Sequence, residues 1–232
     1  MILVGIDDTD ILDARGTNKL ARALAERVAP RWRCDFILRH QLLVDPRIPY
    51  TSHNGSASLH LRPLGGAGAA ELAEELRAGM LADFVEGSDP GLCVAEGVPE
   101  AVVAFGQRCR REVVDADEAR ALAAAHGLRL EGLGGTEGGV IGALAAVGLG
   151  ACGDYGRVVV NGAHPDDLSG EQTVAAVRAR GVEAILPVEG GPPVEGGLVD
   201  VGKHLRPNRR GGRTVLFVEP SGAEGWRVVR RD

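Results

Sequence analysis

The chain has 232 residues and a mass of 24.2 kDa, with 44% hydrophobic and 25% charged side chains. This composition is typical of folded globular proteins and excludes an intrinsically disordered chain. At about 150 residues per domain, the length predicts one or two domains. No apolar run approaches the roughly 20 residues of a membrane span. The first residues also lack the pattern of a signal peptide, so we expect a cytoplasmic protein without membrane contact.

The net charge of −6 argues against a dedicated nucleic-acid binder, because such proteins are usually basic. Aromatic residues make up only 3% of the chain, too few for a base-stacking surface. The charge is uneven, since residues 199–232 hold eight Lys or Arg against four acids. The four cysteines lie far apart and form no C-x-x-C pair, which predicts reduced structural thiols and no zinc site.

Hydrophobic spacing and turn residues predict the helices and strands. The first is a buried strand over 1–6, followed by a helix over 18–29 with Thr17 as its N-cap. Asp115 and Glu118 predict the start of another helix, which Gly127 ends. Ser169 and Gln172 predict the start of a helix that ends at 181. The remaining helices are expected over 69–84, 99–108 and 140–149, and strands over 36–44, 57–61, 91–95, 157–161, 184–188, 198–201, 214–218 and 226–229.

Helices and strands alternate irregularly, which predicts an α/β or α+β chain with a mixed sheet. The segment 189–197 is rich in glycine and proline and is the best internal linker or long loop.

The strongest chemical signal is GIDDTD at 5–10, where Asp7, Asp8, Thr9 and Asp10 directly follow a buried strand. Ligands of open α/β sheets gather at the carboxyl ends of strands. Three carboxylates this close repel one another unless a cation lies among them. Oxygen ligands of this kind suit Mg²⁺ bound together with nucleotide phosphates. The alternative is an acidic turn with only local hydrogen bonds.

Two further segments could face phosphate. Thr17 lies at a predicted helix start, where a hydroxyl can meet a bound anion, although the residue type alone favours an ordinary N-cap. A glycine-rich loop at 134–139 opens the helix over 140–149, and its backbone N–H groups could hold phosphate oxygens. A flexible turn before a tightly packed helix is the alternative. The phosphate-binding candidates of this loop are Gly135, Thr136, Gly138 and Gly139.

The long polar loop at 45–56 could line a base or substrate pocket through Tyr50, His53 and Asn54, although a loop histidine is more often solvated. The basic cluster that includes Lys203 and Arg206 could hold phosphate or substrate. A solvated hairpin turn explains that cluster as well.

Several segments, taken in order, resemble one family, the archaeal tRNA 2-agmatinylcytidine synthetases. The segments are GIDDTD at 5–10 with the following Thr17, DPRIPY at 45–50 with Asn54, SDPG at 88–91, REVVDADEARALAAAHG at 111–127 and GGVIGALAAVG at 138–148. The resemblance covers roughly residues 1–165. It implies a kinase-like core with a ferredoxin-like α+β portion, here near 63–131, and a C-terminal α+β portion over 166–232.

The resemblance implies an enzyme that uses ATP and Mg²⁺. It assigns Asp7, Asp8 and Asp10 as ligands of Mg²⁺ and phosphate, and Thr17 as a threonine that accepts phosphoryl. The family continues into an OB-fold and a zinc ribbon that hold tRNA, and this sequence lacks both. We therefore expect a phosphotransferase or ligase-like enzyme that acts on a small molecule, with tRNA disfavoured and a homodimer left open.

Three alternatives remain open. The chain could modify tRNA cytidine with a partner that supplies the RNA contacts. It could bind nucleotide without catalysis. It could also be an Asp-x-Asp phosphatase that uses Asp8 and Asp10, although that pattern expects a threonine where Leu12 stands.

Overall fold

The computed structural model describes residues 1–9, 16–48, 54–162, 167–222 and 225–231. The chain divides into two compact units, Met1–Cys152 and Gly153–Asp232, and each is described by itself. The division falls directly after a helix and earlier than the boundary near residue 165 that the sequence predicts. The expected class, a mixed α/β chain, is confirmed.

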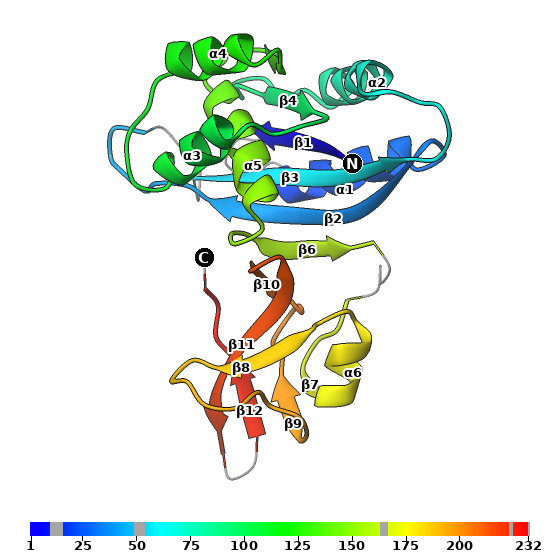
Figure 1. Ribbon diagram of the computed structural model, residues 1–232, viewed down its shortest axis with the longest axis vertical. Coiled ribbons are helices and arrows are strands. Elements are labelled where there is room, and N and C mark those ends of the chain that lie inside the picture. The colour runs from blue at the N-terminus through cyan, green and yellow to red at the C-terminus, as the bar shows by residue number, and fades with distance from the viewer. Residues whose placement is uncertain (10–15, 49–53, 163–166, 223–224, 232) are drawn as a thin grey trace. The chain divides into compact units, whose positions relative to one another are not determined.

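The first unit is built on five antiparallel strands in the order β5-β4-β1-β3-β2 (Figure 1). Its first six elements run β-α-β-β-α-β, the order of a split βαβ arrangement. Residues 63–131 contribute to this same sheet. The strands are β1 (Ile2–Asp7), β2 (Trp32–Gln41), β3 (Gly55–Pro63), β4 (Gly91–Ala95) and β5 (Arg129–Gly132).

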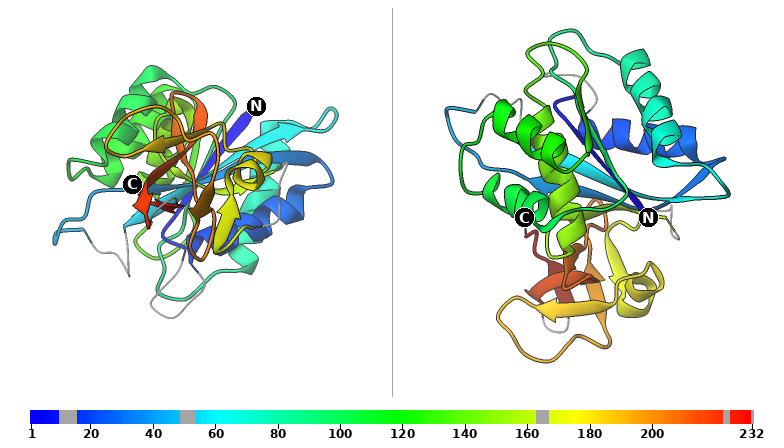
Figure 2. Two further views of the ribbon diagram at one scale, coloured as in Figure 1. Left: turned by 90° about the horizontal axis from the view of Figure 1, so that it is seen from below. Right: turned by 45° about the horizontal axis from the view of Figure 1, so that its top comes forward.

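Helices cover both faces of this sheet (Figures 1 and 2). On one face lie α1 (Thr17–Val28) and α2 (Ala69–Ala82), which contact each other. On the other face α5 (Val140–Cys152) crosses β1, β3 and β4, with α3 (Glu100–Arg108) and α4 (Ala116–Ala125) packed against it. The central strands are therefore buried on both faces.

The two faces of the sheet carry different side chains because residues alternate along each strand. The face toward α1 and α2 carries large aliphatic residues such as Ile6, Leu59 and Leu92, each fully buried. The face toward α5 carries small or polar residues such as Gly5 and Ser58. A helix can approach the second face much more closely than the first.

Glycines allow α5 to pack backbone to backbone on the sheet. A Cβ atom at Gly5 would lie 1.9 Å from the carbonyl oxygen of Ala143, and one at Gly91 would lie 2.1 Å from that of Gly139. Neither position has room for a side chain. This packing fixes the N-terminus of α5 over the ends of β1 and β4.

Two helix starts differ from the sequence prediction. Thr17 is the first residue of α1, and the N-cap is Gly16, so the Thr17 hydroxyl is not used as a cap. In the second unit, Glu171–Thr173 form strand β7, and the helix starts at Val174 because Thr173 accepts a hydrogen bond from the Ala176 amide at 3.1 Å. The predicted cap at Asp115 is confirmed, because its carboxylate accepts from the Glu118 amide at 2.8 Å.

The second unit is a mixed sheet with one short helix. Its strands follow the order β6-β10-β11-β12-β9-β7, with β8 parallel to β11. Its core gathers aliphatic residues such as Ile185, Val199 and Leu216. The elements are β6 (Arg157–Asn161), β7 (Glu171–Thr173), α6 (Val174–Ala179), β8 (Ala184–Pro187), β9 (Leu198–Asp200), β10 (Asn208–Arg210), β11 (Arg213–Ser221) and β12 (Gly225–Val228).

Among the helices that the structure describes, none has the length and apolar character needed to cross a membrane.

Candidate functional site

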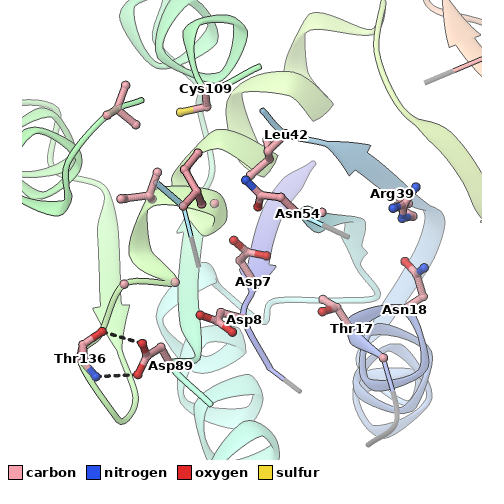
Figure 3. A pocket seen from close by; sticks show the side chains of 18 of the residues that line it. Asp7, Asp8, Thr17, Asn18, Arg39, Leu42, Asn54, Asp89, Cys109 and Thr136 are labelled. Atoms are coloured by element: carbon pink, nitrogen blue, oxygen red, sulfur yellow. Dashed lines mark hydrogen bonds between the residues drawn. The ribbon is translucent and has the colours of Figure 1, made fainter. Parts of the chain in front are cut away.

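A cleft of about 300 Å³ opens in the first unit, where β1 ends and where α1 and α5 begin (Figure 3). Asp7, Asp8 and the starts of the two helices line it. The other lining residues include Arg39, Leu42, Ile48, Asn54, Cys109, Glu112 and Val114, and Arg39 lies beside Asn18 (Figure 3).

Asp7 and Asp8 both face this cleft, although they are consecutive in the chain (Figure 3). Side chains of successive strand residues point to opposite faces. This alternation does not apply to Asp8, because β1 ends at Asp7 and Asp8 adopts a left-handed conformation with φ of 49°. Aspartate tolerates this conformation better than most residues. The turn therefore brings two carboxylates into one cleft.

The surroundings of Asp7 are built for close approach. A Cβ atom at Gly142 would lie 1.7 Å from Oδ2 of Asp7, so only glycine in the first turn of α5 leaves room for this carboxylate. The Asp7 carboxylate thus lies against the positive end of the helix.

The donor set fits Mg²⁺ held together with phosphate. Mg²⁺ usually takes one or two carboxylates and completes its shell with water and phosphate oxygens, and Asp7 and Asp8 supply the two carboxylates. The described residues contain no group of three His, Cys, Asp or Glu placed to hold a metal ion by themselves. The third predicted carboxylate, Asp10, lies outside the described residues.

Two helix N-termini meet the cleft. Gly16, Thr17 and Asn18 line it at the start of α1, and Gly138, Gly139, Ile141 and Gly142 line it at the start of α5. Neither helix has an acidic residue in its first turn, and the N-cap of α1 makes no side-chain hydrogen bond. The first backbone N–H groups of a helix bind anions readily, and the helix dipole favours negative charge there. The cleft is therefore suited to a polyphosphate.

The glycine-rich loop before α5 is held by Asp89. The Thr136 amide donates to Oδ1 of Asp89 at 2.6 Å, and the Thr136 hydroxyl donates to Oδ2 at 2.5 Å. Gly135 has a φ of 60°, and a Cβ there would lie 1.6 Å from Oδ1 of Asp89. Because Gly135 has no side chain, Asp89 can approach the loop closely. Gly135 itself is not among the described residues that line the cleft.

Thr17 lies on the cleft wall, and Thr9 lies behind it. Thr9 is only 5% exposed, and its hydroxyl donates to the Thr17 hydroxyl at 3.3 Å. Thr9 is not among the described residues that line the cleft. It therefore orients Thr17 from inside the unit.

The lining residues outside the carboxylates and the helix starts combine charge with apolar surface. Asn54 is fixed by a hydrogen bond from its side-chain amide to the carbonyl of Leu43 at 2.7 Å. Arg39 donates to the side chain of Gln41 at 3.0 Å. Burial raises the pKa of Cys109 to about 12, so its thiol stays protonated and is a poor nucleophile.

The structure brings together seven of the 14 residues that the sequence predicts for the site. Asp7, Asp8, Thr17, Asn54, Thr136, Gly138 and Gly139 line one cleft. Tyr50 and His53 lie outside the described residues. Lys203 and Arg206 belong to the second unit, where Arg206 pairs with Asp167 at 2.9 Å.

Sequence reasoning missed Asp89, Arg39 and Glu112 as site residues. The only signal for Asp89 was its place in the SDPG segment, and Arg39 falls in the middle of a predicted strand. Their position in the cleft depends on strand pairing, which local patterns do not contain.

The first unit is thus an α/β unit in which paired carboxylates and two helix N-termini surround one cleft. No model of a known protein family matches the chain, and no curated protein matches it. Solved structures do.

The chain is similar to a tRNA fluorescent labelling enzyme, with a TM-score of 0.55 and 28% identity. It is also similar to apo TiaS, a tRNA(Ile2) agmatidine synthetase, with a TM-score of 0.54 and 27% identity. A third similar structure is the complex of TiaS with tRNA(Ile2), AMPCPP and agmatine, with a TM-score of 0.55 and 26% identity. Each match covers 63% of this chain and 35% of the other, so the matched part spans about a third of those proteins.

These matches confirm the resemblance to tRNA 2-agmatinylcytidine synthetases at the level of the core fold.

Proposed function

We propose that the first unit binds ATP with Mg²⁺ in this cleft and transfers its γ-phosphoryl group. The observation that carries the proposal is the meeting of two helix N-termini with the carboxylates of Asp7 and Asp8. Phosphoryl transfer depends mainly on positioning and on neutralising charge, and this arrangement supplies both. The likeness to TiaS structures solved with ATP and with AMPCPP supports the nucleotide.

The residues that line the cleft have separate tasks in this proposal. Asp7 and Asp8 hold Mg²⁺, which when bound neutralises phosphate oxygens. The N–H groups at the start of α5 bind the phosphates, and Asp89 holds the Thr136 loop in place before that helix. Thr17, oriented by Thr9, places its hydroxyl toward the γ-phosphoryl group and either binds or accepts it.

The acceptor in this proposal is a small molecule. The entire excess of six acidic residues lies in residues 1–152, whereas 153–232 hold equal numbers of acidic and basic residues. An acidic unit repels a polyanion such as RNA, and a cleft of about 300 Å³ has the size of a small-molecule site.

A second candidate is modification of tRNA with a partner that supplies the RNA contacts. It is favoured by one observation, the likeness to a TiaS structure solved with tRNA(Ile2) and agmatine. Consumption of ATP that depends on added tRNA, and not on amines or other small acceptors, would select this candidate.

The test is incubation with γ-labelled ATP and Mg²⁺, followed by intact mass and peptide mapping. We expect label on Thr17 or steady release of phosphate. Lasting ATP binding without either would indicate a binding module, and absence of ATP binding would overturn the proposal. Hydrolysis of a generic phosphomonoester that is lost in Asp8→Asn would indicate a phosphatase instead.

Asp8→Asn is the sharpest variant, because it removes one charge and keeps the shape of the side chain. We expect a loss of Mg²⁺-dependent ATP turnover of at least a hundredfold with an unchanged melting temperature. Asp117→Asn is the matched control, since Asp117 is an exposed carboxylate at the start of α4 and should keep full turnover. Unchanged turnover in Asp8→Asn would remove the carboxylate pair from the mechanism.

A further inference from the structure

A row of buried polar side chains continues from the cleft along the sheet, beneath α5. Ser56, Ser58 and His60 alternate on one face of β3, and His40 of β2 is paired with Ser56. All four are at most 9% exposed. A Cβ atom at Gly150 of α5 would lie 2.9 Å from the Ser58 hydroxyl, so this is the face that α5 covers.

The row starts beside Asp7. The last registered pair of β1 and β3 is Ile6 with Ala57, so the next pair along is Asp7 with Ser56. Asp7 also faces α5, as its contact with Gly142 shows. Paired residues on one face have Cβ atoms about 4.5–5.5 Å apart. Register therefore makes Ser56 and Asp7 neighbouring side chains on one face of the sheet.

The far end of the row is already hydrogen-bonded. The Ser58 hydroxyl lies 2.8 Å from Nε2 of His40 and 3.3 Å from Nε2 of His60. The end near Asp7 makes fewer hydrogen bonds. There, Nδ1 of His40 and the Ser56 hydroxyl are buried without a hydrogen-bond partner among the described residues. Buried polar atoms without partners are costly and are usually retained for a reason.

The chemistry of the groups sets one direction for the whole row. An ionised carboxylate only accepts hydrogen bonds, so Ser56 must donate to Asp7. Its oxygen would then accept from Nδ1–H of His40, a bond that the described structure does not contain, while Nε2 of His40 accepts from the Ser58 hydroxyl. Ser58 in turn accepts from Nε2–H of His60. In such a chain each of the four links joins one donor to one acceptor, and both imidazoles are neutral.

We propose that Ser56 and His40 are positioning residues for Asp7, through a one-way hydrogen-bond chain that runs from His60 to the Asp7 carboxylate. Outer-shell partners of a metal-binding carboxylate hold its orientation and its affinity for the ion. The inference rests on the proposed function for the role of Asp7. The chain itself also makes a prediction that needs no ligand, because it fixes the tautomer of His40.

The first measurement is ¹⁵N NMR of the imidazole groups in the unliganded protein, with His40 assigned by comparison with His40→Gln. We expect His40 to carry its proton on Nδ1. In Ser56→Ala the acceptor of that proton is lost, and the His40 signals should shift. A proton on Nε2 of His40 in the wild type would overturn the chain.

The second measurement is binding of Mn²⁺, used as a paramagnetic probe for Mg²⁺, with and without ATP. We expect Ser56→Ala to weaken Mn²⁺ binding about tenfold without loss of melting temperature, as is typical for an outer-shell partner. Ser56→Thr keeps the hydroxyl and should restore binding. Cys93→Ala is the matched control, because Cys93 is fully buried on the same face of the sheet but pairs with Gly5 and not with Asp7.

The outcomes separate the two proposals. Wild-type Mn²⁺ affinity in Ser56→Ala, or an equal loss in Cys93→Ala, would overturn the positioning role while leaving the proposed function intact. Failure of the wild type to bind either Mn²⁺ or ATP would overturn the proposed function and the positioning role together. The tautomer of His40 would then still decide whether the chain exists.

Discussion

At the scale of single residues, the cleft depends on the lack of a side chain at Gly142 in α5. The Asp7 carboxylate occupies the space that a side chain at position 142 would need. Asp7 supplies charge and Gly142 supplies room, so neither residue can be understood alone.

Gly142→Ala should therefore act like a mutation of Asp7. A methyl group 1.7 Å from Oδ2 forces the carboxylate away, and we expect the affinity for ATP with Mg²⁺ to fall more than tenfold. Alanine is favoured over glycine inside a helix by about 1 kcal/mol, so any loss of stability reports the clash. Titration calorimetry measures the affinity, and Gly66→Ala, with open space around its Cβ, is the control. Unchanged affinity of Gly142→Ala for ATP with Mg²⁺ would show that the Asp7 carboxylate can bind the ligand from another position.

His40 gives the molecule an acid-sensitive point. Burial, followed by the charges of His60, Arg110 and Arg39, lowers the pKa of His40 to about 3, against about 6.5 in the unfolded chain. Between these two pKa values, the unfolded state binds a proton at His40 that the folded state does not bind. This contribution to stability is complete above pH 6.5 and is lost as the pH falls toward 3, by up to about 1.4 kcal/mol per pH unit.

Urea denaturation at several pH values between 3.5 and 7.5 tests this expectation. His40→Gln should show a shallower loss of stability with acid than the wild type, because its side chain does not titrate. Carboxylates contribute equally in both proteins and cancel in the comparison. Parallel curves for the two proteins would exclude His40 as the source.

At the scale of elements, the first turn of α1 carries no acidic residue, although acids there normally stabilise a helix. Asn18→Asp should raise the stability of the unit by about 0.3–1 kcal/mol through the helix dipole. It should also weaken ATP binding about tenfold, because the new charge faces the phosphates. The two effects have opposite signs, which a general disturbance of the fold would not produce.

Ala70→Asp is the matched control for this prediction, because it places the same charge at the second residue of α2, which does not line the cleft. It should raise stability similarly and leave ATP binding unchanged. Equal weakening in both variants would mean that net charge, and not the start of α1, controls affinity.

Most elements were predictable because they carry a clear hydrophobic period, as α1 and β1 do. The strands β5, β7 and β10 could not be predicted, because each has only three or four residues and most of these residues are polar. The start of α1 was misplaced by one residue because Thr17 suits an N-cap, whereas Gly16 takes that place. For the site, the carboxylates and glycines had local signals, while Asp89 enters only through contacts made across the folded unit.

At the scale of the whole molecule, each unit contains one tryptophan. Trp32 is fully buried in the first unit, and Trp226 packs against the core of the second. The Trp226→Phe variant therefore reports unfolding of the first unit alone, and Trp32→Phe reports the second.

Ligand should then act on one tryptophan more than on the other. ATP with Mg²⁺ at a hundred times its Kd should stabilise the first unit by about 2.7 kcal/mol, which moves the Trp32 transition to higher temperature in a fluorescence melt. If the two units unfold separately, the Trp226 transition stays in place. A shift confined to Trp226 would place the nucleotide in the second unit.

The contact of α5 with the sheet also has a genetic consequence. Every glycine codon begins with two guanines, and each single-base change that alters the amino acid replaces glycine with a residue that has a side chain or with a stop. At Gly5, Gly91 and Gly142 an added side chain would meet backbone or the Asp7 carboxylate at about 2 Å. No point mutation that changes the amino acid at these three codons is therefore mild, and a library of random variants selected for function should keep glycine at all three positions.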